Sequence, residues 1–119
     1  GDYGNAIAQF RSVVQINKAA LAAEARYETA ACYFQLNKLS DAEKSAFETI
    51  NKSGSYDYWV TRAYILLGDV YYRQKDYFNA KATFQSIVDN TLNNELKTEA
   101  QAKLTKVLDD EAQSSKVGN

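Results

Sequence analysis

The sequence predicts an all-α fold of antiparallel helix–turn–helix units stacked side by side, and three observations lead to that prediction. The 119 residues contain no proline, the residue that most strongly interrupts helices. Apolar residues recur at helical spacing along most of the chain. The same apolar pattern returns at intervals of 36 and 38 residues, which is typical of helical repeat proteins.

One set of equivalent helices is predicted over residues 3–17, 39–52 and 77–90. Residues 2–10 superpose on residues 76–84 at an offset of 74. Apolar positions follow one another at spacings of 3, 4, 3 and 1, so they form a single stripe on a helix. They are Tyr3, Ala6, Phe10, Val13 and Val14 in the first copy, Leu39, Ala42, Ala46, Thr49 and Ile50 in the second, where Thr49 is the one polar exception, and Tyr77, Ala80, Phe84, Ile87 and Val88 in the third.

A second set of helices, predicted over residues 20–36 and 57–74, alternates with the first. The matching residues, at an offset of 38, are Ala25, Ala30, Tyr33 and Phe34 in one copy and Ala63, Gly68, Tyr71 and Tyr72 in the other. Residues 59–72 are apolar on almost every side, so neighbouring helices should cover them. Short connectors at 37–38 and 75–76 require antiparallel neighbours, and Gly54 supplies the turn of the longer loop at 51–56.

A sixth helix is predicted over residues 93–112, with Leu96, Ala100, Leu104, Val107 and Leu108 on one stripe and polar residues elsewhere. That pattern is typical of a capping helix. We therefore predict one domain over residues 1–113. It consists of the second helix of a truncated repeat (1–17), two repeats (20–52 and 57–90) and the cap (93–113), and residues 114–119 form a frayed tail.

The pattern resembles the tetratricopeptide repeat (TPR), a helix–turn–helix unit of about 34 residues. The resemblance is clearest in Tyr64, Leu67, Gly68 and Tyr71 followed by Ala80 and Phe84, and weaker copies carry Ala30, Tyr33 and Ala42, and then Ala6 and Phe10. It implies a right-handed superhelix, or α-solenoid, in which these eleven residues pack the repeats. The chain departs from the family in lacking the proline that often closes a repeat and in its longer intervals.

The composition excludes most catalytic chemistry and indicates a protein that is not an enzyme. With no histidine there is no imidazole for a nucleophilic triad or a His-ligated metal, so we expect no cofactor and no metal. The single cysteine, Cys32, matches Val70 in the next repeat and is expected to be a buried structural thiol. A net charge of −1 argues against nucleic-acid binding, and no apolar run is long enough for membrane insertion.

The resemblance implies a protein or peptide partner bound on the concave face of the repeat. Carried onto this chain, that face holds Glu24, Tyr27, Ala31, Phe34 and Gln35 from one repeat and Arg62, Ile65, Asp69, Tyr72 and Arg73 from the next. Aromatic residues with a few charges are typical of protein-binding surfaces. A clamp for the terminal carboxylate of a chaperone tail is not expected, because only Arg62 retains the charge that such TPR proteins use.

Two other roles stay open at this point. The segment is either a purely architectural C-terminal end of a longer TPR solenoid or a regulatory module of a larger enzyme. The first predicted helix lacks its repeat partner, so it either self-associates or is covered by upstream repeats. We expect a soluble protein of bacterial origin, located in the cytoplasm or the envelope (periplasm).

Overall fold

The structure is a computed structural model that describes the backbone of residues 2–55 and 57–117 and the side chains of residues 18–55 and 57–116. These residues form five α-helices and no strand. They are α1 (Asp2–Gln35), α2 (Leu39–Lys52), α3 (Asp57–Arg73), α4 (Tyr77–Asn90) and α5 (Asn94–Val117). The predicted all-α helical repeat is confirmed.

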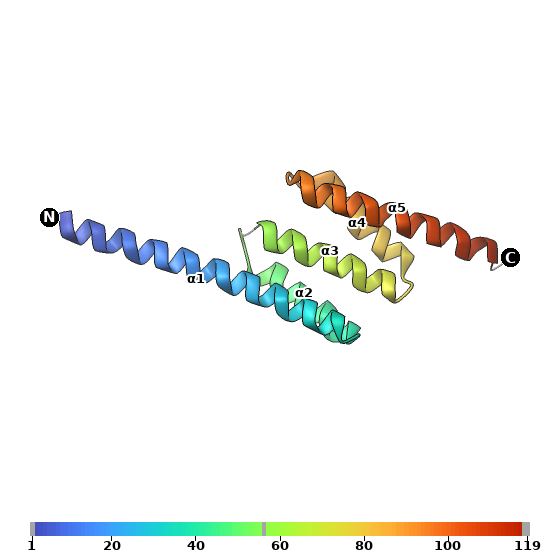
Figure 1. Ribbon diagram of the computed structural model, residues 1–119, viewed down its shortest axis with the longest axis horizontal. Coiled ribbons are helices and arrows are strands. Elements are labelled where there is room, and N and C mark those ends of the chain that lie inside the picture. The colour runs from blue at the N-terminus through green and yellow to red at the C-terminus, as the bar shows by residue number, and fades with distance from the viewer. Residues whose placement is uncertain (1, 56, 118–119) are drawn as a thin grey trace.

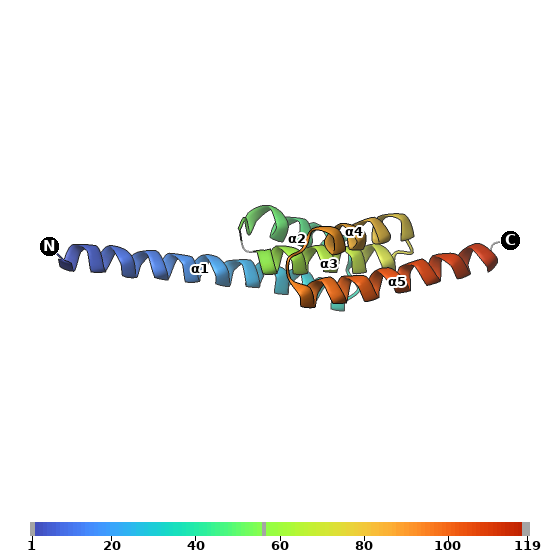
Figure 2. The ribbon, with the colours of Figure 1, turned by 90° about the horizontal axis from the view of Figure 1, so that it is seen from above.

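The helices lie in two layers, with α1, α3 and α5 in one and α2 and α4 in the other (Figures 1 and 2). Each helix contacts the next along the chain, and α3 also contacts α1 and α5. The molecule measures 77 × 28 × 17 Å, and α1 and α5 project at opposite ends of its long axis (Figure 1). We call α1, α3 and α5 the three-helix layer.

The predicted break between residues 17 and 20 is absent, so the chain has five helices and not six. Residues 2–35 form one continuous helix of 34 residues. The equivalent connection between α2 and α3 turns through Ser53, Gly54 and Ser55, with Gly54 at a φ of 53°. Residues 17–23 instead hold four alanines and no glycine, and alanine has the highest helix propensity. Residues 3–17 therefore do not fold back on residues 20–36.

One tight turn reverses the chain in each of the two helical hairpins, α1–α2 and α3–α4. Asn37 and Lys75 follow α1 and α3 with left-handed φ values of 59° and 61°, the conformation that commonly ends a helix. The next amides, of Lys38 and Asp76, donate hydrogen bonds to the carbonyls of Tyr33 and Tyr71. The carboxylate of Asp76 then accepts a hydrogen bond from the amide of Asn79 and caps α4. The predicted antiparallel hairpins thus have matching turns.

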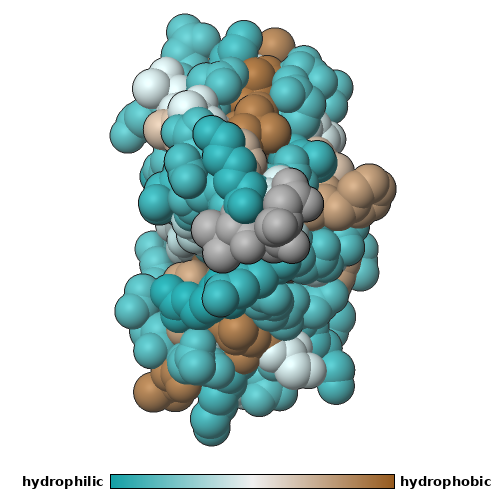
Figure 3. Space-filling view, turned by 90° about the vertical axis from the view of Figure 1, so that its right-hand side faces the viewer, coloured by the Kyte–Doolittle hydropathy of each residue, from teal (hydrophilic) through white to brown (hydrophobic). Residues whose placement is uncertain are grey.

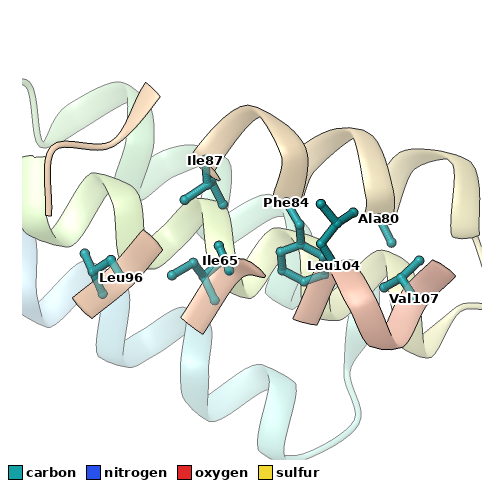
Figure 4. Close-up of a cluster of buried hydrophobic side chains, with 8 residues drawn as sticks. Ile65, Ala80, Phe84, Ile87, Leu96, Leu104 and Val107 are labelled. Carbon is teal, nitrogen blue, oxygen red and sulfur yellow. The ribbon is translucent and has the colours of Figure 1, made fainter. Parts of the chain in front are cut away.

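The main core lies between α3, α4 and α5 (Figure 4). It consists of Ile65, Ala80, Phe84, Ile87, Leu96, Ala100, Leu104 and Val107. A smaller cluster of Ala30, Ala46, Leu66 and Leu67 joins α1 and α2 to α3. Four residues of the predicted α5 stripe are buried, but Leu108 is exposed because no described helix follows α5 to cover it. Helix α5 continues to Val117, so residues 114–117 belong to the helix and not to a tail.

Of the nine predicted repeat-packing residues whose side chains are described, all except Tyr64 are buried or half-buried. Ala30, Ala42, Leu67, Gly68, Ala80 and Phe84 are buried, and Tyr33 and Tyr71 are half-buried. Tyr64 is exposed. The side chains of Ala6 and Phe10 lie outside the described residues. Gly68 meets the Phe84 ring so closely that a Cβ atom built on it would lie 2.5 Å from Cε1 of Phe84.

Cys32 is exposed, so the prediction of a buried thiol is wrong. Its counterpart Val70 is fully buried. The difference follows from the position of each helix, since α3 contacts all four other helices and α1 contacts only α2 and α3. The described part of the chain holds no helix that packs on the Cys32 side of α1.

Candidate partner-binding face

The ten predicted partner-binding residues come from α1 and α3, which contact each other in the three-helix layer. Glu24, Tyr27, Ala31 and Phe34 are half-buried, and Gln35 is exposed at the end of α1. On α3, Arg62, Asp69 and Tyr72 are half-buried and Arg73 is exposed. Ile65 is only 3% exposed, because it belongs to the core that α5 covers. Ile65 therefore offers no surface to a partner in this structure.

Phe34 and Arg73 form a contact between the two halves of this face. The guanidinium carbon of Arg73 lies 3.9 Å from the centre of the Phe34 ring. A terminal nitrogen of Arg73 also donates a hydrogen bond of 3.3 Å to the Phe34 carbonyl. A cation over an aromatic ring contributes about 0.5–1 kcal/mol at an exposed site. The contact fixes an exposed cation beside an aromatic ring at the α1–α3 seam.

Tyr27 and Trp59 form a second aromatic contact across the same seam. Their ring centres lie 5.7 Å apart. Burial raises the pKa of the Tyr27 hydroxyl above 10.0, and the nearby positive charge of Arg62 opposes that rise. The hydroxyl therefore stays protonated at neutral pH and can donate a hydrogen bond.

Helix α5 binds three of the four polar residues of α3 that were predicted to face a partner. Arg62 pairs with Glu99 at 2.9 Å, and Asp69 pairs with Lys103 at 2.8 Å. The Tyr72 hydroxyl donates a hydrogen bond to the Asp110 carboxylate. All three α5 residues were missed by sequence reasoning. The signal that could have found them is their distance of 34 to 38 residues from oppositely charged or polar residues on α3, which is about one repeat.

The acidic run at 109–111, which includes Asp110, also attaches α5 to its neighbours. Glu111 forms an ion pair of 2.9 Å with Lys81 on α4. Partly exposed ion pairs contribute roughly 0–1 kcal/mol each, so their effect lies more in fixing the position of α5 than in stability. Among the described residues, no three histidine, cysteine or acidic side chains converge as metal ligands.

Asp69 gives this face a measurable pH dependence. Burial raises the pKa of its carboxyl above 3.8, and the hydrogen bond from Lys103 only partly opposes the rise. The fold therefore binds this proton more tightly than the unfolded chain does. The stabilisation that comes from protonated Asp69 is present below pH 3.8 and is lost as the pH rises through the folded-state pKa.

We expect Asp69→Asn to remove that dependence. The free energy of unfolding of the wild type minus that of Asp69→Asn should fall between about pH 3 and about pH 7. Urea denaturation at each pH measures the difference. Asp109→Asn, at an exposed position of α5, controls for the change in net charge. A difference that rises with pH would contradict the assignment.

A separate groove lies away from the predicted residues, between the start of α3, the end of α4 and the connection to α5. Its volume is about 550 Å³, and its lining includes Tyr58, Tyr64, Leu92 and Leu96. Sequence reasoning missed it because it forms only where three segments meet.

Seen from the end of the molecule where α5 finishes, the surface is mostly hydrophilic, with apolar residues in small separate patches (Figure 3).

Comparison with known proteins adds one match. A family model described as tetratricopeptide repeat matches residues 62–90, which cover most of α3 and all of α4. No curated protein and no solved structure matches the chain. No helix among the described residues has the length and apolar character needed to cross a membrane. TPR units are non-catalytic and generally mediate protein–protein interaction. The match covers residues 62–90 of the 119 and, together with the all-helical architecture, supports a protein that contains a tetratricopeptide repeat.

Proposed function

We propose that the chain is a non-catalytic scaffold that binds a protein or peptide partner on the three-helix layer, along the seam of α1 and α3. The observation that carries the proposal is the aromatic and cationic group at this seam. Tyr27 and Phe34 come from α1, and Arg73 comes from α3. Aromatic residues and arginine are enriched among the residues that dominate binding energy at protein interfaces.

Arg73 is the strongest single candidate on this face. Its guanidinium has five N–H donors, and the structure pairs one of its nitrogens with the Phe34 carbonyl. The stacking on Phe34 holds the rest of the group at an exposed position, ready for a carbonyl or carboxylate of a partner. Gln35, also exposed at the end of α1, adds an amide donor and acceptor.

Arg62, Asp69 and Tyr72 support the face in a different way. Their α5 partners hold them in place, so a substitution at any of them also disturbs the packing of α5. A binding test at these residues would not separate loss of a partner from loss of structure. Arg73 has no such link to α5 among the contacts of the described residues, so it is the better test position.

We expect Arg73→Glu to abolish partner binding while the melting temperature changes little. The charge reversal removes both the stacking on Phe34 and the exposed cation. The measurement is affinity capture from a lysate of the source cell with quantitative mass spectrometry, alongside thermal unfolding. Lys44→Glu is a matched charge reversal, because Lys44 is an exposed residue of α2 in the other layer. This variant should capture the same proteins as the wild type.

A purely architectural role and a different binding surface give different results. If the segment only continues a solenoid, the wild type should enrich no protein over the blank resin. If another surface binds the partner, Arg73→Glu should enrich the same proteins as the wild type. Either result would contradict the proposed face. The bacterial origin and the cytoplasmic or envelope location stay predictions.

A further inference from the structure

One face of α1 is exposed where the equivalent face of α3 is buried. On α3, Ala63 and Val70 are 0% exposed and Leu67 is 4% exposed. Their counterparts on α1, at the offset of 38, are Ala25, Cys32 and Thr29, and all three are exposed. Helices α1 and α3 are therefore equivalent in the repeat, but this face is covered on α3 and uncovered on α1.

Helix α2 covers the face on α3. Ala46 of α2 lies in one cluster with Leu66 and Leu67 of α3. The Tyr71 hydroxyl also donates a long hydrogen bond of 3.5 Å to the Glu43 carboxylate. These contacts place α2 antiparallel to α3, as the connection between them requires. Among the described residues, no helix of the α2 type lies on this face of α1.

The chain contains that helix in the first half of α1. Residues 3–17 repeat the apolar pattern of α2 at an offset of 36. They cannot cover residues 20–35 of the same copy, because both segments belong to one continuous helix. The first half of α1 instead projects beyond the other helices (Figures 1 and 2). A complementary helix and an uncovered face lie end to end in each molecule.

We propose that two copies of this chain pair through α1, with residues 3–17 of each copy covering residues 20–35 of the other. The arrangement has two-fold symmetry, since both copies give and receive the same segment. The two α1 helices run antiparallel and cross near residue 20. The α2–α3 contacts Ala46 with Leu67 and Glu43 with Tyr71 correspond to positions 10 with 29 and 7 with 33 of α1.

The uncovered face is suited to burial. Ala25 and Cys32 are small and carry no strongly polar group. Thr29 already donates its hydroxyl hydrogen to the Ala25 carbonyl at 2.8 Å, so covering it leaves no donor unpaired. The absence of a turn between residues 17 and 20 also favours exchange of a helix between copies. The continuous helix holds its two halves apart within one copy.

A cysteine crosslink tests the pairing directly. Ala6→Cys places a thiol at the position that should face Cys32 of the second copy. A short bismaleimide should then link the chains into a dimer on a reducing gel. Ala8→Cys is the matched control, since residue 8 lies about 200° around the helix from residue 6 and should give little crosslinked dimer. A crosslink that stays within one chain, or no difference between the two variants, would overturn the proposal.

A second experiment adds a turn between the two halves of α1. Insertion of the sequence of residues 53–56, which contains Gly54, between Asn17 and Lys18 gives the chain a turn. Residues 3–17 can then fold back on their own copy. Sedimentation equilibrium should show a dimer for the wild type and a dimer dissociation constant at least about tenfold higher for the insertion. A monomeric wild type, or equal dissociation constants, would also overturn the proposal.

Discussion

Phe84→Ala is expected to destabilise the protein by about 3–5 kcal/mol, the range for removing a buried aromatic ring. Phe84 is 1% exposed and lies at the centre of the α3–α4–α5 core, beside Ile65 and Leu104 (Figure 4). The total free energy of unfolding of a domain is about 5–15 kcal/mol, so the loss is a large part of it. Urea denaturation followed by circular dichroism measures the change.

The matched control is Phe78→Ala on the same helix. Phe78 is 73% exposed, so the substitution removes the same atoms without leaving a cavity. We expect a change within about 0.5 kcal/mol, as for other surface substitutions. Equal losses for the two variants would mean that the Phe84 ring does not lie in the core.

Gly68→Leu is expected to destabilise by about 3 kcal/mol, at the upper end of the range for overpacking. Even the first atom of a side chain at Gly68 would lie 2.5 Å from Cε1 and 2.6 Å from Cζ of the Phe84 ring. That ring is itself enclosed and has little room to move. Leucine has the higher helix propensity, so any loss of stability comes from the crossing and not from the helix.

A double-mutant cycle assigns that loss to one contact. Gly68→Ala should cost more in the presence of Phe84 than in a Phe84→Leu background, with a coupling of about 0.5–3 kcal/mol. The other repeat already shows the alternative, since Ala30 and Ala46 occupy the two equivalent positions and lie in one cluster. Additive effects would argue that Gly68 and Phe84 do not meet at the crossing.

The sequence predicted the second half of the fold better than the first half. Helices α3 and α4 carry the most complete motif, with Gly68 and Phe84 at complementary positions, and their predicted bounds agree with the structure to within one residue. The break in α1 was wrong because the repeat pattern implied a turn where the chain has no glycine like Gly54. Local helix propensity, with four alanines in residues 17–23, favours the continuous helix.

The candidate face shows the same limit for single residues. Tyr27, Phe34 and Arg73 could be named from the repeat, because equivalent positions share one side of a helix. Their pairing across α1 and α3 could not, because it depends on how the two helices pack. The same holds for Arg62 and Asp69, whose charges looked available to a partner and instead pair with Glu99 and Lys103.

By itself the sequence determined α2, α3 and α4, their amphipathic stripes and their order, because helical spacing and short connectors are local properties. Only the tertiary structure decided which stripes are covered. Cys32 and Val70 hold the same position in the repeat, and one is exposed while the other is fully buried. Burial depends on the neighbours that a helix has in space, and α3 has four while α1 has two among the described helices.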